Sequence, residues 1–136
     1  MPKPIHCILL IDDDPDDNFY HQLVITESGL CETVRIAENG MAAMRYLAQP
    51  EAADYERPDV IFLDINMPGM NGFEFLEEYH RLPEELKSLV LVMMLTTSIN
   101  PADRGQAAAF EVVRGYYAKP LTTGILAEIV ARYFPE

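Results

Sequence analysis

A run of four apolar residues that ends in a single aspartate constrains this chain more than any other stretch. The run Val60–Leu63 is short and unbroken, which is typical of a strand buried on both faces of a parallel sheet. Asp64 follows directly, and Pro68, Gly69 and Gly72 then turn the chain. A carboxylate at the end of a buried strand is costly unless charged or hydrogen-bonding groups surround it. We therefore expect other polar side chains to gather around Asp64.

Strand-like and helix-like segments alternate five times along the chain. The expected strands are Ile5–Ile11, Thr33–Ala37, Val60–Leu63, Val90–Leu95 and Tyr116–Ala118. The expected helices are Pro15 to a stop at Gly29, Met41–Ala48, about Gly72–Arg81, Asn100–Ala109 with Gly115 as the breaker, and a last helix capped by Thr122 or Thr123. This alternation predicts a doubly wound α/β fold, in which helices cover both faces of a parallel sheet through right-handed crossovers.

Several side chains are expected in the interior because of their type and spacing. Phe19 and Leu23 share one face of the first helix, and Phe19 is assigned to the core together with Phe62, Phe73, Phe75 and Tyr133. Cys7 and Cys31 lack the Cys-x-x-Cys spacing of metal or redox sites, so we expect buried free thiols.

The charge of the chain limits its partners. A formal net charge of −12 argues against binding to nucleic acid through phosphate neutralisation, and it opposes binding to an anionic membrane surface. No apolar run approaches the roughly 20 residues that span a bilayer, and the proline-rich first residues do not resemble a signal peptide. We expect a cytoplasmic protein without a nucleic-acid or membrane partner.

Four of the five expected strands end in a polar residue whose type suits one mechanism. These residues are Asp12 and Asp13 after the first strand, Asp64 after the third, Thr96 after the fourth and Lys119 after the fifth. In a parallel sheet all carboxyl ends lie on one edge, which is where ligands bind in such folds. A cap, a turn or a solvated surface would explain each residue alone, but their coincidence favours one shared site.

The chemistry of this group points to phosphoryl transfer. Three clustered carboxylates repel one another, so their pKa values rise unless a cation is present. Oxygen-only ligands suit a hard divalent ion such as Mg²⁺. Together with Lys119 and Thr96, such an ion would form a clamp for an incoming phosphoryl group beside Asp64. We therefore expect phosphoryl transfer to Asp64, which would give an acyl phosphate.

Over essentially its whole length, the sequence resembles the receiver domain of two-component response regulators. The matching motifs are Leu10–Asp14, Phe62–Gly72, Met94–Ser98 and Tyr116–Pro120. The resemblance implies a flavodoxin-like (βα)₅ sheet of strand order 2-1-3-4-5. It also implies a single receiver domain over residues 1–136 with no output domain, similar to the small stand-alone receivers that partner phytochrome-like and other sensor kinases.

By position, the resemblance implies that Asp64 is the phosphoacceptor. Mg²⁺ would be bound by the side chains of Asp13 and Asp64 and by the backbone carbonyl of Asn66, with Asp12 assisting through water. Asn66 and Ser98 lie two residues beyond Asp64 and Thr96, where the family tunes the lifetime of the phosphoryl group.

The resemblance also assigns the switch residues. Thr96 would be the switch hydroxyl, Tyr116 the switch aromatic, and Lys119 the phosphate-binding cation, whose bond to Pro120 is commonly cis in this family. Residues 110–114 depart from the family pattern, with one apparent extra residue where a small-residue turn is usual. This departure affects the expected shape of the output face.

A receiver would take its phosphoryl group from a sensor histidine kinase or a histidine phosphotransfer protein, and would then bind an unidentified effector protein. It would not be an enzyme, beyond assisting its own phosphorylation and dephosphorylation, and we expect a monomer or a weak homodimer. A pseudo-receiver that binds partners without phosphorylation is one alternative. A haloacid-dehalogenase-type phosphohydrolase is another, but its motif requires Thr or Val where Asp16 stands and a paired aspartate after Lys119.

Overall fold

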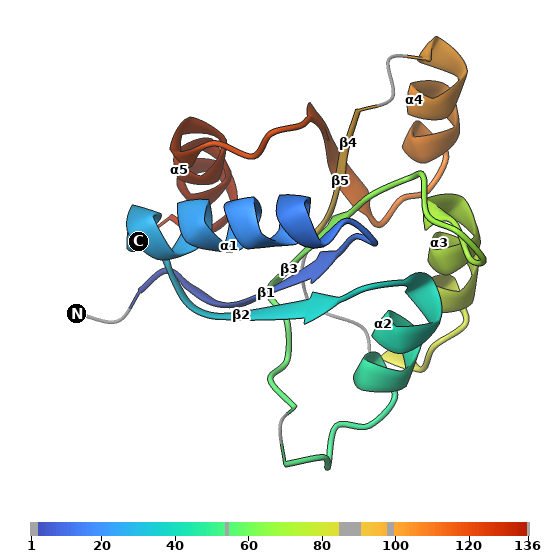
Figure 1. Cartoon of the computed structure of the whole chain (residues 1–136), viewed down its shortest axis with the longest axis horizontal. Coiled ribbons are helices and arrows are strands. Elements are labelled where there is room, and N and C mark those ends of the chain that lie inside the picture. Colours follow the sequence, from blue (N-terminus) through green and yellow to red (C-terminus); the bar gives the residue numbers. More distant parts are fainter. Residues whose placement is uncertain (1–2, 54, 85–90, 98–99, 136) are drawn as a thin grey trace.

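The computed structural model describes residues 3–135 except 54, 85–90 and 98–99. Its strands are β1 (Ile5–Ile11), β2 (Cys31–Ala37), β3 (Val60–Leu63), β4 (Leu91–Thr96) and β5 (Val113–Ala118). They form one sheet in the order β2-β1-β3-β4-β5, and every pairing is parallel. The predicted flavodoxin-like α/β fold is therefore confirmed (Figure 1).

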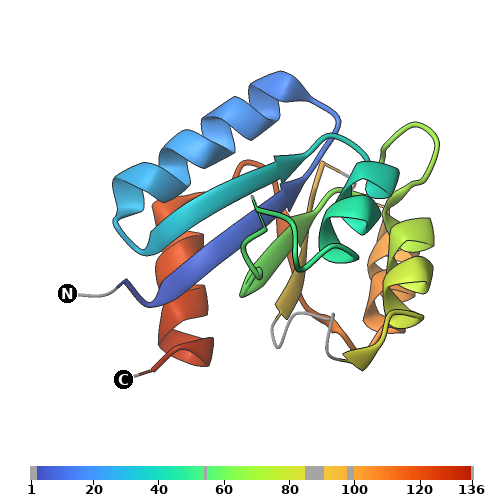
Figure 2. The same ribbon diagram turned by 90° about the horizontal axis from the view of Figure 1, so that it is seen from below.

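Helices cover both faces of this sheet. They are α1 (Pro15–Ser28), α2 (Gly40–Leu47), α3 (Gly72–His80), α4 (Pro101–Ala108) and α5 (Thr123–Tyr133). Helices α1 and α5 lie on one face, and α2, α3 and α4 lie on the other (Figures 1 and 2). Within the described residues, no helix has both the length and the apolar character that a bilayer crossing requires.

Strand alternation divides the core into two apolar clusters, one on each face. In β1, Leu9 and Ile11 point to the cluster beneath α2, α3 and α4, whereas Ile8 and Leu10 point to the cluster beneath α1 and α5. Both sets are almost fully buried because β1 has strands on both sides and helices on both faces. The rigid centre of the sheet therefore holds the residues that follow β1 and β3.

The first helix begins and ends at the signals expected from the sequence. The carboxylate of Asp14 accepts hydrogen bonds from the backbone N–H groups of Asp16 and Asp17, at 2.9 and 3.3 Å, and Pro15 occupies the first turn. Gly29 ends α1 in the left-handed conformation with φ of 71°. These caps fix where the acidic first turn of α1 stands relative to the end of β1.

The face of α1 that meets the sheet is not the one predicted. Phe19 is 70% exposed and Leu23 is 44% exposed, so the assignment of Phe19 to the core is wrong. The buried side chains of α1 are instead Asn18, His21 and Ile25, which share one face at spacings of three and four residues. Two of these three are polar because the first half of the helix packs over the polar carboxyl end of the sheet.

The last strand begins earlier than predicted, at Val113 instead of Tyr116, and Gly115 lies inside it. The β4–β5 pairing shifts register between Val92 and Met93, and Gly115 is the partner of Met93. A Cβ atom on Gly115 would lie 2.7 Å from the sulfur of Met93, so this glycine permits close strand packing and does not break a helix. The second strand likewise begins earlier, at Cys31.

The loop between α2 and β3 is attached to the core at Glu56. The hydroxyl of Tyr46 donates to the carbonyl of Glu56 and accepts from its N–H group, both at 2.6 Å. The thiol of Cys7 lies 3.8 Å from the same carbonyl. Cys7 and Cys31 are buried and free, as predicted, and burial raises the pKa of Cys7 to about 12 and that of Cys31 to about 11.

Candidate functional site

The carboxyl ends of the two central strands bring three carboxylates together. Ile11 pairs with Leu63, so Asp12 and Asp64 leave the sheet side by side, and the N–H of Asp64 donates to the carbonyl of Ile11 at 3.1 Å. One carboxylate oxygen from each of Asp12, Asp13 and Asp64 lies within 4.8 Å of the other two. Asp12 and Asp64 are buried, whereas Asp13 is exposed at the mouth of the cluster.

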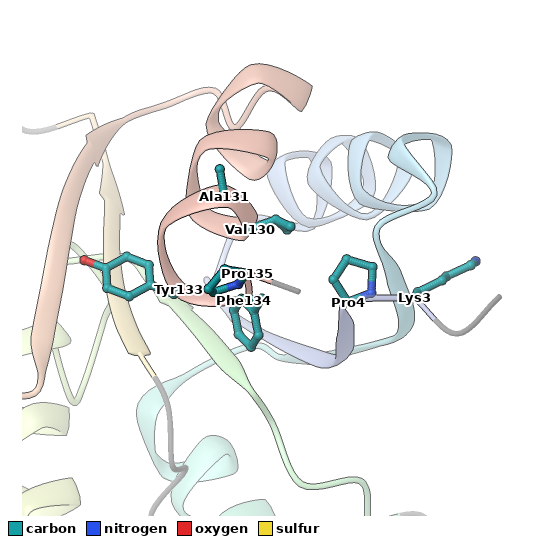
Figure 3. Close-up of a pocket in the computed structure, with 7 residues that line it drawn as sticks. All are labelled: Lys3, Pro4, Val130, Ala131, Tyr133, Phe134 and Pro135. Atoms are coloured by element: carbon teal, nitrogen blue, oxygen red, sulfur yellow. The ribbon is translucent and has the colours of Figure 1, made fainter.

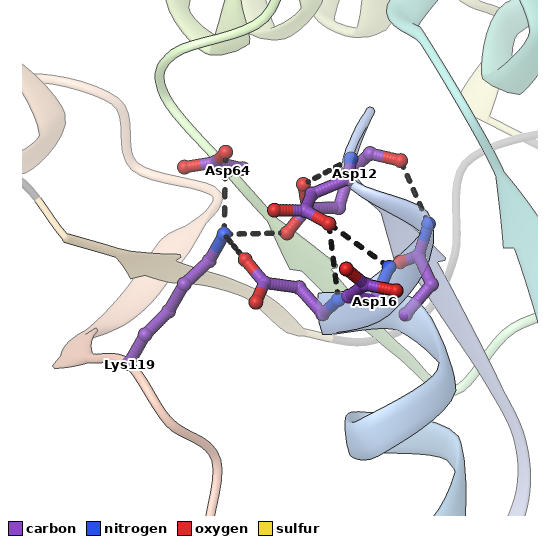
Figure 4. Close-up of polar contacts among 7 residues, drawn as sticks. Asp12, Asp16, Asp64 and Lys119 are labelled. Carbon is purple, nitrogen blue, oxygen red and sulfur yellow. Dashed lines mark hydrogen bonds and ion pairs between the residues drawn. The ribbon is translucent and has the colours of Figure 1, made fainter.

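Lys119 reaches this cluster from the end of β5. Its backbone N–H donates to the carbonyl of Thr96 at 2.9 Å, and its bond to Pro120 is cis. The ammonium Nζ atom lies 2.6 Å from Asp12 Oδ2, 2.8 Å from Asp17 Oδ2 and 3.4 Å from Asp64 Oδ2 (Figure 4). The ammonium therefore contacts carboxylates from β1, α1 and β3 at the same time.

Burial and charge act in opposite directions on the ionisable groups of this site. Burial raises the pKa of Asp64 above its ordinary value, Lys119 opposes that rise, and the charge of Asp12 adds to it. Burial lowers the pKa of Lys119, but its hydrogen bonds to Asp12 and Asp17 outweigh this effect and raise the pKa overall. Lys119 is thus a cation at physiological pH, and burial favours the protonated form of Asp64.

The donor set fits a hard divalent cation. Asp64 Oδ1 is buried and has no hydrogen-bond partner among the described residues. A buried carboxylate oxygen without a partner is costly, and a metal ion is one of the groups that would satisfy it. Carboxylate oxygens from Asp12, Asp13 and Asp64 are the ligand type that Mg²⁺ takes, with water and phosphate oxygens completing its shell.

The other predicted site residues that the structure describes differ in exposure. Thr96 is fully buried at the end of β4, and Asn66 is exposed two residues beyond Asp64. Tyr116 lies partly buried against the apolar cluster beneath α2, α3 and α4, and the guanidinium of Arg104 lies 5.3 Å from its ring centre. The Tyr116 hydroxyl is buried without a partner among the described residues. Ser98 falls outside the described residues.

Three residues of α1 at this site were missed by the sequence reasoning. Asp17 pairs with Lys119, and the side-chain N–H of Asn18 donates to the carbonyl of Asp12 at 2.8 Å. His21 is buried, which lowers its pKa. Asn18 and His21 line a small cavity behind the carboxylates, together with Leu10, Ile11, Asp12, Phe62, Asp64 and Leu95. The sequence did hold a signal for two of these residues. Because Asp14 caps α1, Asp17 and Asn18 fall in the first turn of that helix, close to the end of β1.

A second hollow lies at the opposite end of the sheet, beside the start of β1 and the end of α5 (Figure 3). It is lined by Lys3, Pro4, Val130, Ala131, Tyr133, Phe134 and Pro135. Among the described residues of this lining, the ionisable side chains are those of Lys3 and Tyr133, and none of them is a carboxylate.

A comparison with family models decides the assignment. Residues 8–131 match the model described as the response regulator receiver domain. The chain belongs to the response regulator receiver family. The resemblance inferred from four sequence motifs is therefore confirmed. Receiver domains are signalling domains of two-component systems, and phosphorylation on aspartate and Mg²⁺ binding are typical of them.

Relatives support the same conclusion over most of the chain. The response regulator Rcp1 from Synechocystis sp. is 38% identical over 102 residues, which cover 74% of this receiver and 68% of Rcp1. A structure of the Mn²⁺-bound form of Rcp1 covers 98% of this chain and 95% of its own, with a TM-score of 0.76 and 31% identity.

Two further structures are similar along nearly the whole receiver. A two-component response regulator from Cytophaga hutchinsonii covers 99% of this chain and 100% of its own, with a TM-score of 0.86 and 33% identity. The match to the phosphorylated cyanobacterial phytochrome response regulator RcpA covers 92% of this chain and 88% of the RcpA chain, with a TM-score of 0.73 and 35% identity. All three relatives carry response regulator names, in agreement with the family match.

Proposed function

We propose that this receiver accepts a phosphoryl group on Asp64 from a sensor histidine kinase or a histidine phosphotransfer protein. The observation that carries the proposal is the state of the Asp64 carboxylate, which is buried and leaves Oδ1 without a partner among the described residues. Lys119 approaches the other oxygen of the same carboxylate. A nucleophilic oxygen with a free lone pair beside a fixed cation suits attack on an anionic phosphoryl group.

In the proposed reaction an oxygen of Asp64 attacks phosphorus and forms the acyl phosphate bond. The phosphorus–nitrogen bond to the donor histidine breaks at the same time, and the imidazole keeps the electron pair and takes up a proton. Lys119 offsets the negative charge that the phosphoryl oxygens bring into the cluster. Mg²⁺ bound by Asp13, Asp64 and the Asn66 carbonyl, with Asp12 assisting through water, would supply further neutralisation of those oxygens.

The proposed output is a shift between two conformations of the switch residues. A phosphoryl group on Asp64 would attract the buried hydroxyl of Thr96 and move the start of the following loop. In this structure the Tyr116 ring lies against the core, and the guanidinium of Arg104 lies over the ring. We take this inward position as one of the two switch conformations, and an outward position of the ring as the other. Asn66 and Ser98 would tune how long the phosphoryl group persists.

A receiver of this type would act through another protein. We propose a cytoplasmic setting, a separate effector that binds the face around α4, β5 and α5, and a monomer or weak homodimer. Residues 1–136 would form one receiver unit, and neither nucleic acid nor membrane would be a partner. The net charge of −12 supports the exclusion of both anionic partners.

The test is intact mass after incubation with acetyl phosphate and Mg²⁺, with a phosphohistidine donor as a second phosphoryl source. We expect a gain of one phosphoryl group, about 80 Da, that is lost in Asp64→Asn and in the presence of a chelator. The matched control is Asp59→Asn, because Asp59 lies at the amino end of β3, away from the cluster. Mass gain retained in Asp64→Asn would contradict the assignment of the phosphoacceptor.

The two alternatives give different results in the same set of measurements. A pseudo-receiver would gain no mass from either donor. A phosphohydrolase would turn over p-nitrophenyl phosphate repeatedly instead of stopping after a single covalent transfer.

A further inference from the structure

Lys119 has more carboxylate partners than the proposed phosphoryl chemistry requires. An ammonium group has three N–H donors. Here they face Asp12, Asp17 and Asp64, and the distance to Asp17 is 2.8 Å, compared with 3.4 Å to Asp64. Asp17 is therefore a closer partner of Lys119 than the proposed phosphoacceptor is.

Asp17 differs from the other two partners in position and exposure. Its side chain is 38% exposed, whereas the Asp12 and Asp64 side chains are each 7% exposed and that of Lys119 is 9% exposed. It stands in the first turn of α1, where its N–H group donates to Asp14 and where the helix N-terminus favours a negative charge. The Asp14 cap thus fixes the backbone of Asp17, whose carboxylate contacts Lys119 from helix α1 and not from a strand end.

Lys119 and a divalent cation require the same carboxylates. Asp12 and Asp64 belong to the group of oxygens that would hold the metal, and Lys119 contacts both of them. Two cations at adjacent positions repel each other, so metal binding would drive the ammonium away from these two residues. Asp17 lies outside that group of oxygens and remains available to the ammonium.

From this geometry we infer that Asp17 is a positioning residue that retains the Lys119 ammonium at the site while Asp12 and Asp64 pass from Lys119 to the metal. The inference rests on the proposed function, because it assigns Asp17 a role in assembling that same site. In the absence of Asp17, Lys119 would stay on Asp12 and Asp64 and would compete directly with the metal. The metal would then bind more weakly, although no metal ligand had been removed.

The test compares Asp17→Asn with Asp16→Asn, which removes the same charge from the same turn. Asp16 is exposed, and its backbone N–H bonds to Asp14. We expect Asp17→Asn to weaken Mg²⁺ binding about fivefold, the scale of one partly exposed ion pair, and Asp16→Asn to weaken it less than about twofold. In a Lys119→Met background, where no ammonium competes, both substitutions should have the same small effect.

A second readout needs no metal. The rate at which the Lys119 ammonium protons exchange with water, followed by ¹⁵N NMR at one pH in the metal-free protein, should rise about threefold or more in Asp17→Asn and stay unchanged in Asp16→Asn. Thermal unfolding of each variant establishes that it is folded.

The results separate the inference from the function on which it rests. Equal effects of Asp17→Asn and Asp16→Asn on Mg²⁺ binding, or an unchanged ammonium exchange rate, would overturn the role of Asp17. Wild-type protein that binds no Mg²⁺ would overturn the metal site and with it the inference, even if ammonium exchange showed that Asp17 holds Lys119.

Discussion

His6 on β1 has a carboxylate against each of its ring nitrogens. Nδ1 lies 3.0 Å from Glu32 and Nε2 lies 2.9 Å from Glu56, and the backbone N–H of His6 donates to Asp59 at 2.7 Å. Both ring nitrogens can donate only when the imidazole is protonated. The hydrogen bonds to Glu56 and Glu32 accordingly raise the pKa of His6 above its ordinary value of 6.5.

This arrangement predicts a pH dependence of stability. A raised folded-state pKa favours folding below pH 6.5, and that contribution is lost as the pH rises through the folded-state value. Because the His6 side chain is 54% exposed, we expect a contribution of only about 0.5 kcal/mol after solvent screening. Urea unfolding of wild type and His6→Gln across this range should show it as a difference that shrinks with increasing pH.

The control for this prediction is His80→Gln, since His80 is exposed at the end of α3. A pH-dependent difference that appears in His6→Gln and not in His80→Gln would trace it to the carboxylate partners of His6. A constant difference between wild type and His6→Gln would mean that packing, and not protonation, accounts for the contribution of His6.

At the residue scale the sequence predicted the parts of the site that strand ends determine. Asp12, Asp13 and Asp64 converge because parallel strands end on one edge, and that rule needs no side-chain detail. Asp17 was missed because it follows Asp16 in an acidic run, where composition alone does not distinguish a solvated carboxylate from a paired one. The packing angle of α1 makes that distinction, and it depends on the whole sheet.

Helix α3 begins in close contact with the end of β3. A Cβ atom on Gly72 would lie 2.5 Å from the backbone oxygen of Asp64 and 2.9 Å from the Cα atom of Ile65. Backbone atoms cannot rotate away as a side chain can, so Gly72→Ala should lower the free energy of unfolding by about 2–3 kcal/mol. Urea denaturation measures the change.

Gly105 provides the matched control for this substitution. It lies within α4, and nothing is within 4 Å of the position that its Cβ atom would take. Gly105→Ala should therefore raise the free energy of unfolding by about 0.5–1 kcal/mol through helix propensity. If the two substitutions had the same sign, the close approach at Gly72 would not be the cause of its effect.

At the scale of elements, types and order were predictable, but the starts of β2 and β5 were not. The short apolar runs of β3, of β4 and of β1, which only His6 interrupts, favoured buried strands because buried helices are usually longer. The start of β5 was misplaced because a glycine is common after a helix, and the neighbouring sequence does not show that Gly115 lies inside a strand instead. The close approach of Met93, which comes from another strand, decides between the two.

At the scale of the whole molecule, the charge balance predicts how salts act. With a net charge of −12, screening by any salt should stabilise the fold, and specific metal binding should add to this effect. Mg²⁺ at about ten times its dissociation constant should raise the free energy of unfolding by about 1.4 kcal/mol over NaCl of equal ionic strength. Thermal or urea unfolding in the two salts measures the difference.

The control for this effect is the same comparison in Asp64→Asn, which lacks one of the three clustered carboxylates. We expect little difference between Mg²⁺ and NaCl in that variant. An advantage of Mg²⁺ that persisted in Asp64→Asn would show that the ion stabilises the protein from another part of its acidic surface.

The two ends of the described chain lie on the side of the molecule opposite the carboxylate cluster. Residue 3 precedes the start of β1 and residue 135 follows α5, whereas the cluster lies where β1 and β3 end (Figures 1 and 2). Anything joined to either end, whether an affinity tag, a surface anchor or a tethered kinase, therefore extends away from Asp64. This receiver can be immobilised through either terminus while its acceptor edge stays open to a donor in solution.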